Sequence, residues 1–201
     1  LSLAFYLQFF VEPILEGSGT ARCFIFVTPD AQRTMNTYLG ACSLLSPKDI
    51  DEELVKNSKI SYLEGYCWEE QLAKESLIKA AEIAHKADNK VSLTLSDPFC
   101  VERHRDEFKD LVKKHIDILF ANEIEANKLC QTENFDESIK EISEITEIAA
   151  ITKSDKGAEI CNGKEVVKIE PKIFGKVKDT TGAGDLFAAG FLYGLSKKFS
   201  V

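Results

Sequence analysis

The stretch DTTGAGDLFAAGF, residues 179–191, places a glycine turn directly before a run of small and apolar residues. Gly182 and Gly184 allow backbone angles and close approaches that other residues resist. Because the turn opens a helix, several free N–H groups point outward at its positive end and form a cradle for an anion. Those donors would keep Asp185 ionised, able to accept a proton from a hydroxyl beside a bound phosphate. The plainer alternative is a turn in which Asp185 only caps the helix.

Upstream of this stretch, short apolar runs alternate with amphipathic ones, which predicts repeated strand–helix units. Such alternation is typical of a doubly wound, mostly parallel sheet with helices on both faces, whose ligands bind beyond the carboxyl ends of the strands. Two further strands are predicted around Pro29-Asp30, and a hairpin is predicted at Asn162-Gly163. The predicted strands of the parallel part are 60–66, 90–96, 116–121 and 147–152. The predicted helices are 46–58, 69–88, 100–115, 122–130 and 136–146, and the last element, at 182–195, is predicted as a turn that opens into a helix.

The overall composition is that of one globular domain with a net charge of −8. No long basic run is present, so nucleic acid and anionic membranes are not expected as partners. The apolar residues 1–10 are too short to span a bilayer and have no basic flank, so no membrane anchor or signal peptide is expected. The six cysteines form no CxxC pair, which indicates reduced thiols in a cytoplasmic protein.

The seven residues 179–185 match the DTxGAGD signature without a gap, so the chain resembles the PfkB, or ribokinase-like, family of small-molecule kinases. The resemblance implies a ribokinase-like α/β fold. It also implies that Asp185 is the catalytic base, and that Gly182, Ala183 and Gly184 form the anion hole for phosphoryl transfer from ATP. Asp179 would then lie near a monovalent-cation site, K⁺ in some members, and Thr180 near the nucleotide.

Two further motifs agree with this resemblance. The simplest interpretation of Asn122 and Glu125 is a helix N-cap with a capping box. They also match the NxxE motif of the family, which helps organise Mg²⁺ and the phosphates, and a water-bridged Glu suits the chemistry of Mg²⁺. The loop at 152–157 resembles the nucleotide-contacting T-x-G-x-x-G, with Thr152 and Gly157 in place and Ser154 where the first glycine is usual.

The middle of the chain indicates which kind of molecule accepts the phosphoryl group. The stretches LSDPF, residues 95–99, and DILFANEIEA, residues 117–126, are similar to adenosine kinases rather than to the D-x-N-x-R pattern of many sugar kinases. The implied function is phosphorylation of a primary hydroxyl on a small nucleoside, with adenosine favoured. A ribose- or fructose-type carbohydrate kinase is the alternative.

The resemblance covers about residues 20–198, and residues 1–19 form an atypical segment before a partial kinase domain at 20–201. We find no Gly-Gly pair or acceptor-binding acidic residue before residue 20. The N-terminal lid section and the C-terminal end of the family are therefore expected to be missing, and a non-catalytic remnant of such a kinase is the second hypothesis. A dinucleotide-dependent oxidoreductase would need G-x-G-x-x-G after a strand, which this sequence lacks.

Overall fold

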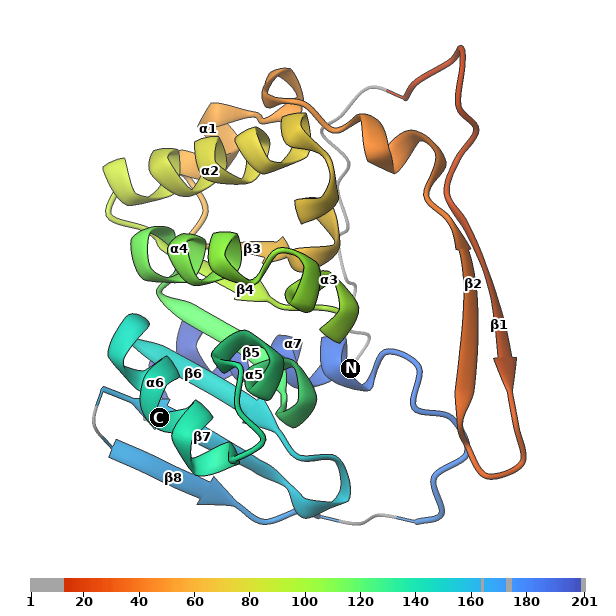
Figure 1. Ribbon diagram of the computed structural model, residues 1–201. Helices are drawn as coiled ribbons and strands as arrows, with labels where there is room; N and C mark the ends of the chain where they lie inside the picture. Colours follow the sequence, from red (N-terminus) through yellow and green to blue (C-terminus); the bar gives the residue numbers. More distant parts are fainter. Residues whose placement is uncertain (1–12, 164, 173–174, 200–201) are drawn as a thin grey trace.

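A six-stranded sheet with the order β3-β4-β5-β6-β7-β8 forms the centre of the molecule (Figure 1). The computed structural model describes residues 13–163, 165–172 and 175–199. The first four strands of the sheet are parallel and the last two are antiparallel, which confirms the mostly parallel α/β class. The strands are β3 (Ile60–Glu64), β4 (Lys90–Thr94), β5 (Ile118–Asn122), β6 (Ile148–Thr152), β7 (Ala158–Asn162) and β8 (Glu165–Ile169).

Helices cover both faces of this sheet, as the alternation of the sequence predicted. On one face, α2, α4, α5 and α6 pack against the strands, and on the other face α7 packs against β5, β6 and β7 (Figure 1). The helices are α1 (Glu52–Lys56), α2 (Gln71–Lys86), α3 (Pro98–Arg103), α4 (Arg105–His115), α5 (Glu123–Cys130), α6 (Phe135–Ile145) and α7 (Ala183–Ser196).

The central strands β5 and β6 are apolar up to their last residues, Asn122 and Thr152, because both of their faces are buried. On β5, Leu119 points into the core beneath α2 and α4, whereas Ile118 and Phe120 point to the side of α7. Phe120 meets the rings of Phe187 and Phe191 edge-on at centroid distances of 6.5 and 5.6 Å. This aromatic contact fixes α7, and therefore the turn before it, against the centre of the sheet.

Two of the predicted helices are divided in the structure. The predicted helix at 100–115 begins earlier, at Pro98, where the Asp97 carboxylate accepts hydrogen bonds from two N–H groups of the first turn. It breaks at His104, whose backbone leaves the helical region and starts α4 in a new direction. In the predicted helix at 46–58, Ser46 caps only a single 3-10 turn, and Asp51 caps α1 separately. At Asp51 a second capping side chain inside the predicted helix starts the new element, whereas the His104 side chain makes no capping hydrogen bond and only its backbone angles interrupt the helix.

Two strands lie apart from the main sheet. β1 (Arg22–Val27) and β2 (Arg33–Tyr38) form an antiparallel ribbon beside it, joined as predicted by the turn at Pro29-Asp30 (Figure 1). Every residue of the ribbon is exposed, including Phe24 and Phe26. The atypical segment predicted for 1–19 lies mainly outside the described residues, and its described part, 13–19, forms neither helix nor strand.

No helix in the described part of the chain is both long and apolar enough to cross a bilayer.

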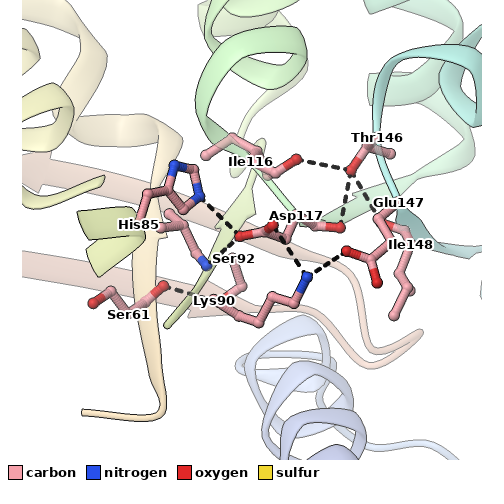
Figure 2. A network of polar contacts seen from close by, with 10 residues as sticks. Ser61, His85, Lys90, Ser92, Ile116, Asp117, Thr146, Glu147 and Ile148 are labelled. Carbon is pink, nitrogen blue, oxygen red and sulfur yellow. Dashed lines mark hydrogen bonds and ion pairs between the residues drawn. The ribbon is translucent and has the colours of Figure 1, made fainter. Parts of the chain in front are cut away.

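A polar network ties together the amino-terminal ends of three neighbouring strands (Figure 2). One carboxylate oxygen of Asp117, just before β5, accepts the N–H of Val91 at 2.7 Å and contacts His85 Nε2 at 3.0 Å. Lys90 bridges from Asp117, at 3.4 Å, to Glu147, just before β6, at 2.5 Å. The network therefore fixes where β4, β5 and β6 begin, relative to α2.

Substitution of Asp117 by Ala should lower the free energy of unfolding by about 2 kcal/mol, because a charged acceptor of several hydrogen bonds is lost. Urea unfolding followed by circular dichroism measures this loss. The matched control is Asp110→Ala on the exposed side of α4, where the ion pair with Lys114 is a solvent-exposed helical pair. That control should change stability by less than about 0.5 kcal/mol. Equal effects of the two substitutions would contradict the structural role of the network.

Candidate active site

The carboxyl ends of the parallel strands bring the predicted site residues to one edge of the sheet. Asn122 ends β5 and pairs in register with Thr152, which ends β6. On the neighbouring strands, Glu64 at the end of β3 pairs with Thr94 at the end of β4. Because parallel strands place equivalent ends side by side, residues from four segments of the sequence face the same space.

The glycine turn before α7 adopts the conformation that its sequence predicted. Gly182 has φ 74°, in the left-handed region, and acts as the N-cap of α7. The Asp179 carboxylate accepts the N–H of Thr181 at 2.8 Å, and the N–H of Ala183 donates to the Thr180 carbonyl at 3.1 Å. The N–H groups of Gly184 and Asp185 follow in the first turn, where no helical carbonyl precedes them. The turn therefore presents the donors expected of an anion-binding helix N-terminus.

Asp185 is exposed in the first turn of α7 and lies near two residues that the sequence did not single out. Partial burial and the neighbouring Asp185 carboxylate raise the pKa of Glu64. Burial, with smaller contributions from Glu64 and Asp185, raises the pKa of Tyr62 to about 12. Both residues belong to the edge strand β3, so Asp185, Glu64 and Tyr62 form one group. The one available signal in the sequence was an acidic residue at the carboxyl end of a predicted strand.

Arg33 links the ribbon to the glycine turn. Its guanidinium donates to the Thr180 hydroxyl at 2.8 Å across 147 residues of sequence. Hydrogen bonds from Thr181, followed by the charge of Arg33, lower the pKa of Asp179. Arg33, on β2, therefore lies beside the glycine turn.

Asn122 and Glu125 form the predicted capping box at the start of α5. The Asn122 side chain accepts the N–H of Glu125 at 2.9 Å, while the N–H of Asn122 donates to the Glu125 carboxylate at 3.0 Å. The Glu125 side chain is buried, with the residue only 5% exposed. Burial, together with the nearby Asp97 carboxylate, raises its pKa to about 7, although the hydrogen bonds from Asn122 oppose the shift.

The loop between β6 and β7 contains the other predicted nucleotide contacts. Ser154 has φ 55° and Gly157 has φ 90°, so both residues lie in the left-handed region. Ser154 therefore adopts, at some cost in strain, a backbone conformation that glycine would take freely. At Gly157 a Cβ atom would lie 2.0 Å from the carbonyl oxygen of Ile169, so no other residue fits there.

The predicted metal-binding residues do not converge on one point. Among the residues that the structure describes, no three His, Cys, Asp or Glu side chains are arranged to hold a metal ion. Both Glu125 oxygens already accept hydrogen bonds from Asn122, and Asp179 is engaged with Thr181. This donor set fits a Mg²⁺ ion that keeps its waters and meets Glu125 through one of them, but it does not fit direct ligation by several carboxylates.

Two surface hollows of about 260 and 310 Å³ lie elsewhere, between α2 and α4 and beside α5. Neither is lined by a residue predicted for the site. The candidate site is therefore defined by convergent polar groups at the edge of the sheet and not by an enclosed cavity.

An α/β sheet with a glycine turn before a helix, a carboxylate in the first turn of that helix and polar strand ends is the arrangement of the ribokinase-like fold. The family model "pfkB family carbohydrate kinase" matches residues 11–201. The chain therefore belongs to the PfkB family, whose members are ATP-dependent phosphotransferases that act on alcohol groups.

Several relatives have the same fold. The adenosine kinase of Sinorhizobium meliloti is 45% identical with a TM-score of 0.91, over 94% of this chain and 58% of its own. The Rhizobium etli "probable sugar kinase protein" is 48% identical with a TM-score of 0.88, over 90% of this chain and 55% of its own. The adenosine kinase of Saccharomyces cerevisiae is 26% identical over 89% of this chain and 56% of its own length. The chain thus spans little more than half the length of these relatives.

The raised pKa of Glu125 makes stability depend on pH. Below the ordinary value of 4.5 Glu125 is protonated in both states, so its contribution is fully present, and it is lost as pH rises toward about 7. The difference in unfolding free energy between the wild type and Glu125→Gln should therefore fall by on the order of 3 kcal/mol across this range. Urea unfolding at pH 4.5 to 8 measures it.

The control for this experiment is Glu144→Gln, on the exposed side of α6. A flat difference between the wild type and Glu125→Gln at every pH would show that the pKa of Glu125 is the same in the folded and the unfolded chain, which would contradict the predicted shift.

Proposed function

We propose that this edge of the sheet catalyses phosphoryl transfer from ATP to a primary hydroxyl of a small nucleoside, with adenosine favoured. The observation that carries the proposal is the position of Asp185, which follows the left-handed turn at Gly182 in the first turn of α7. The backbone N–H groups of the glycine turn can donate hydrogen bonds to an anion. The Asp185 carboxylate, in the same short segment, can accept a proton.

Asp185 is proposed as the general base. Its carboxylate lies in the first turn of α7, at the positive end of the helix. It would take the proton of the acceptor hydroxyl as that oxygen attacks the terminal phosphoryl group. Glu64, on the neighbouring strand, is placed to accept hydrogen bonds from other hydroxyls of the acceptor, which would orient it toward Asp185.

Gly182, Ala183 and Gly184 are proposed as the anion hole, with Arg33 as its cationic side. The hydrogen bond from Arg33 to Thr180 holds a guanidinium next to the turn, where negative charge develops during transfer. Because that bond comes from the ribbon, the ribbon contributes a charge to the reaction site.

Thr152, Ser154, Gly157, Asn122 and Thr180 are proposed to contact the nucleotide. When bound, Mg²⁺ would neutralise charge on the phosphates of ATP, and Glu125 would hold it through a water. Asp179 is proposed to lie beside a monovalent cation, since Thr181 and Arg33 keep its carboxyl in the ionised form by lowering its pKa.

The choice of adenosine rests on the relatives and on the middle of the sequence. The Sinorhizobium and Saccharomyces relatives are both adenosine kinases. The similarity to the Rhizobium sugar kinase, at 48% identity, supports a carbohydrate acceptor as the second candidate. We further propose a cytoplasmic location, because all six cysteines are free thiols.

Asp185→Asn should lower kcat for ADP formation from adenosine and ATP with Mg²⁺ by about 10³-fold, because the base is lost while its shape is kept. The affinity for ATP should remain within about threefold, since the anion-binding N–H groups are unchanged. Coupled measurement of ADP release, with ribose and fructose as parallel acceptors, gives both kcat and the acceptor class.

The control variant is Asp110→Asn, at a surface carboxylate of α4 far from this edge of the sheet. Unchanged turnover of Asp185→Asn would refute its role as base. A wild-type chain that binds ATP but turns over none of the three acceptors would favour the non-catalytic remnant.

Arg33→Met should lower kcat by about 10²-fold with a smaller effect on KM for adenosine, because a charge that acts mainly on the transition state is removed. Steady-state kinetics at saturating ATP separate the two parameters. Arg22→Met, on the other strand of the ribbon, is the matched control. A loss of the same size in both variants would assign the effect to the ribbon as a whole and not to Arg33.

A further inference from the structure

In the loop at 152–157, the backbone is strained at Ser154 and closely surrounded at Gly157. Ser154 is held at φ 55°, and the carbonyl oxygen of Ile169 closes the space beside Gly157. Within the loop, the N–H of Lys153 donates to the Gly157 carbonyl at 2.8 Å and the N–H of Lys156 to the Lys153 carbonyl at 3.0 Å. A non-glycine residue stays in the left-handed region only where its surroundings hold it there. The structure must therefore contain a group that holds this loop.

A buried carboxylate lies directly beneath the loop. Glu159, on β7, is only 4% exposed although its strand neighbours are apolar core residues. Carboxylates are almost never this buried without a partner, because desolvation of an unpaired charge is costly. Its partners are Lys153, with Nζ at 2.9 Å, and Lys168, with Nζ at 3.6 Å.

The two lysines hold Glu159 in different ways. The side chain of Lys168, on β8, is 71% exposed, whereas that of Lys153 is only 20% exposed. The Lys153 ammonium also lies 4.2 Å from the centre of the Phe135 ring, at the start of α6. The hydrogen bond to Glu159, followed by the charges of Glu159, Glu123 and Asp136, raises the pKa of Lys153, so the ion pair stays formed at neutral pH.

Lys153, Glu159 and Phe135 together form what we call the loop latch. Its lysine is the second residue of the loop, between Thr152 and the strained Ser154, so fixing this side chain fixes the backbone on either side. Its other two members belong to β7 and α6, which are parts of the packed core. The latch thus connects this strained loop to two rigid elements. No residue of the latch is among those predicted to contact a ligand.

We propose that the loop latch is a positioning device that holds residues 152–157 in the conformation that binds the adenine nucleotide, and so sets the affinity for ATP. The proposal rests on the proposed function, because it takes this loop as a nucleotide contact. Lys153 and Glu159 act through the loop backbone. Without the latch, the loop would occupy its binding conformation for only part of the time, and the apparent Kd would rise in inverse proportion.

The test compares Lys153→Met, Glu159→Gln and the double variant with the wild type by isothermal titration of ATP in the presence of Mg²⁺. We expect each to raise the Kd about tenfold, as for a loop that is in place about a tenth of the time. Lys168→Met, which removes the exposed partner of the same carboxylate, should change the Kd by less than about twofold. Lys153→Arg should restore the Kd to within about threefold, because a guanidinium both pairs with a carboxylate and stacks on a ring.

Two further readouts separate positioning from simple stabilisation. Hydrogen exchange at the amides of Lys153 and Lys156 should accelerate in Lys153→Met without ATP, while amides in β5 keep their protection. Urea unfolding gives the global stability of each variant. If Lys153→Met lowers the stability but leaves both the Kd and the exchange in the loop unchanged, the latch is only structural and the proposal is wrong.

A single substitution can leave a buried charge unpaired and so prevent folding. In that case the double variant, which removes both charges of the pair, is measured in its place. If Lys168→Met raises the Kd as much as Lys153→Met does, the effect comes from the charge on Glu159 and the proposed role of the loop is wrong. If the wild type binds no ATP, the proposed function fails and the role of the latch in nucleotide binding fails with it. If the wild type binds ATP and the latch variants bind it equally well, only the inference about the latch fails.

Discussion

The parallel pairing of β5 with β6 is the constraint on which the rest of the site depends. Its register sets Asn122 opposite Thr152, so the start of α5 and the loop after β6 open onto the same space. The pairing is fixed at the other end of the strands by Asp117, Lys90 and Glu147, which lie at the amino-terminal edge. Polar contacts at one edge of the sheet thus decide the alignment of the functional residues at the opposite edge.

Electrostatics at the carboxyl edge is dominated by acidic groups. Glu64, Glu125 and Asp185 lie there with Asp97, and burial and mutual repulsion raise the pKa of Glu64 and of Glu125. The positive end of α7 and the guanidinium of Arg33 oppose this charge at the glycine turn. Such an edge favours a ligand that brings cations with it, because unaccompanied phosphates would be repelled by the carboxylates. A nucleotide bound with Mg²⁺ meets this condition.

Most of the fold could be predicted from the sequence because its signals are local. The apolar runs at β4, β5 and β6, the Asn162-Gly163 hairpin and the capping box of Asn122 with Glu125 each depend on residues a few positions apart. The glycine turn at 179–185 belongs to the same class, and its resemblance to the PfkB signature predicted the family correctly. The break at Asp51 was missed because a second capping side chain competes there with an otherwise continuous helical pattern. The break at His104 was missed because it is a change of backbone angles with no capping hydrogen bond from the side chain.

The sequence by itself determined the class of fold, the family and the conformation of the turn before α7, because periodicity, capping and glycine conformations are properties of short segments. Only the tertiary structure decided that Glu64 and Tyr62 join Asp185, that Arg33 reaches Thr180 and that Lys153 is held by Glu159 and Phe135. Arg33 and Thr180 are 147 residues apart. No local pattern encodes such contacts, since they arise when the sheet orders its strands and brings distant segments to a common edge.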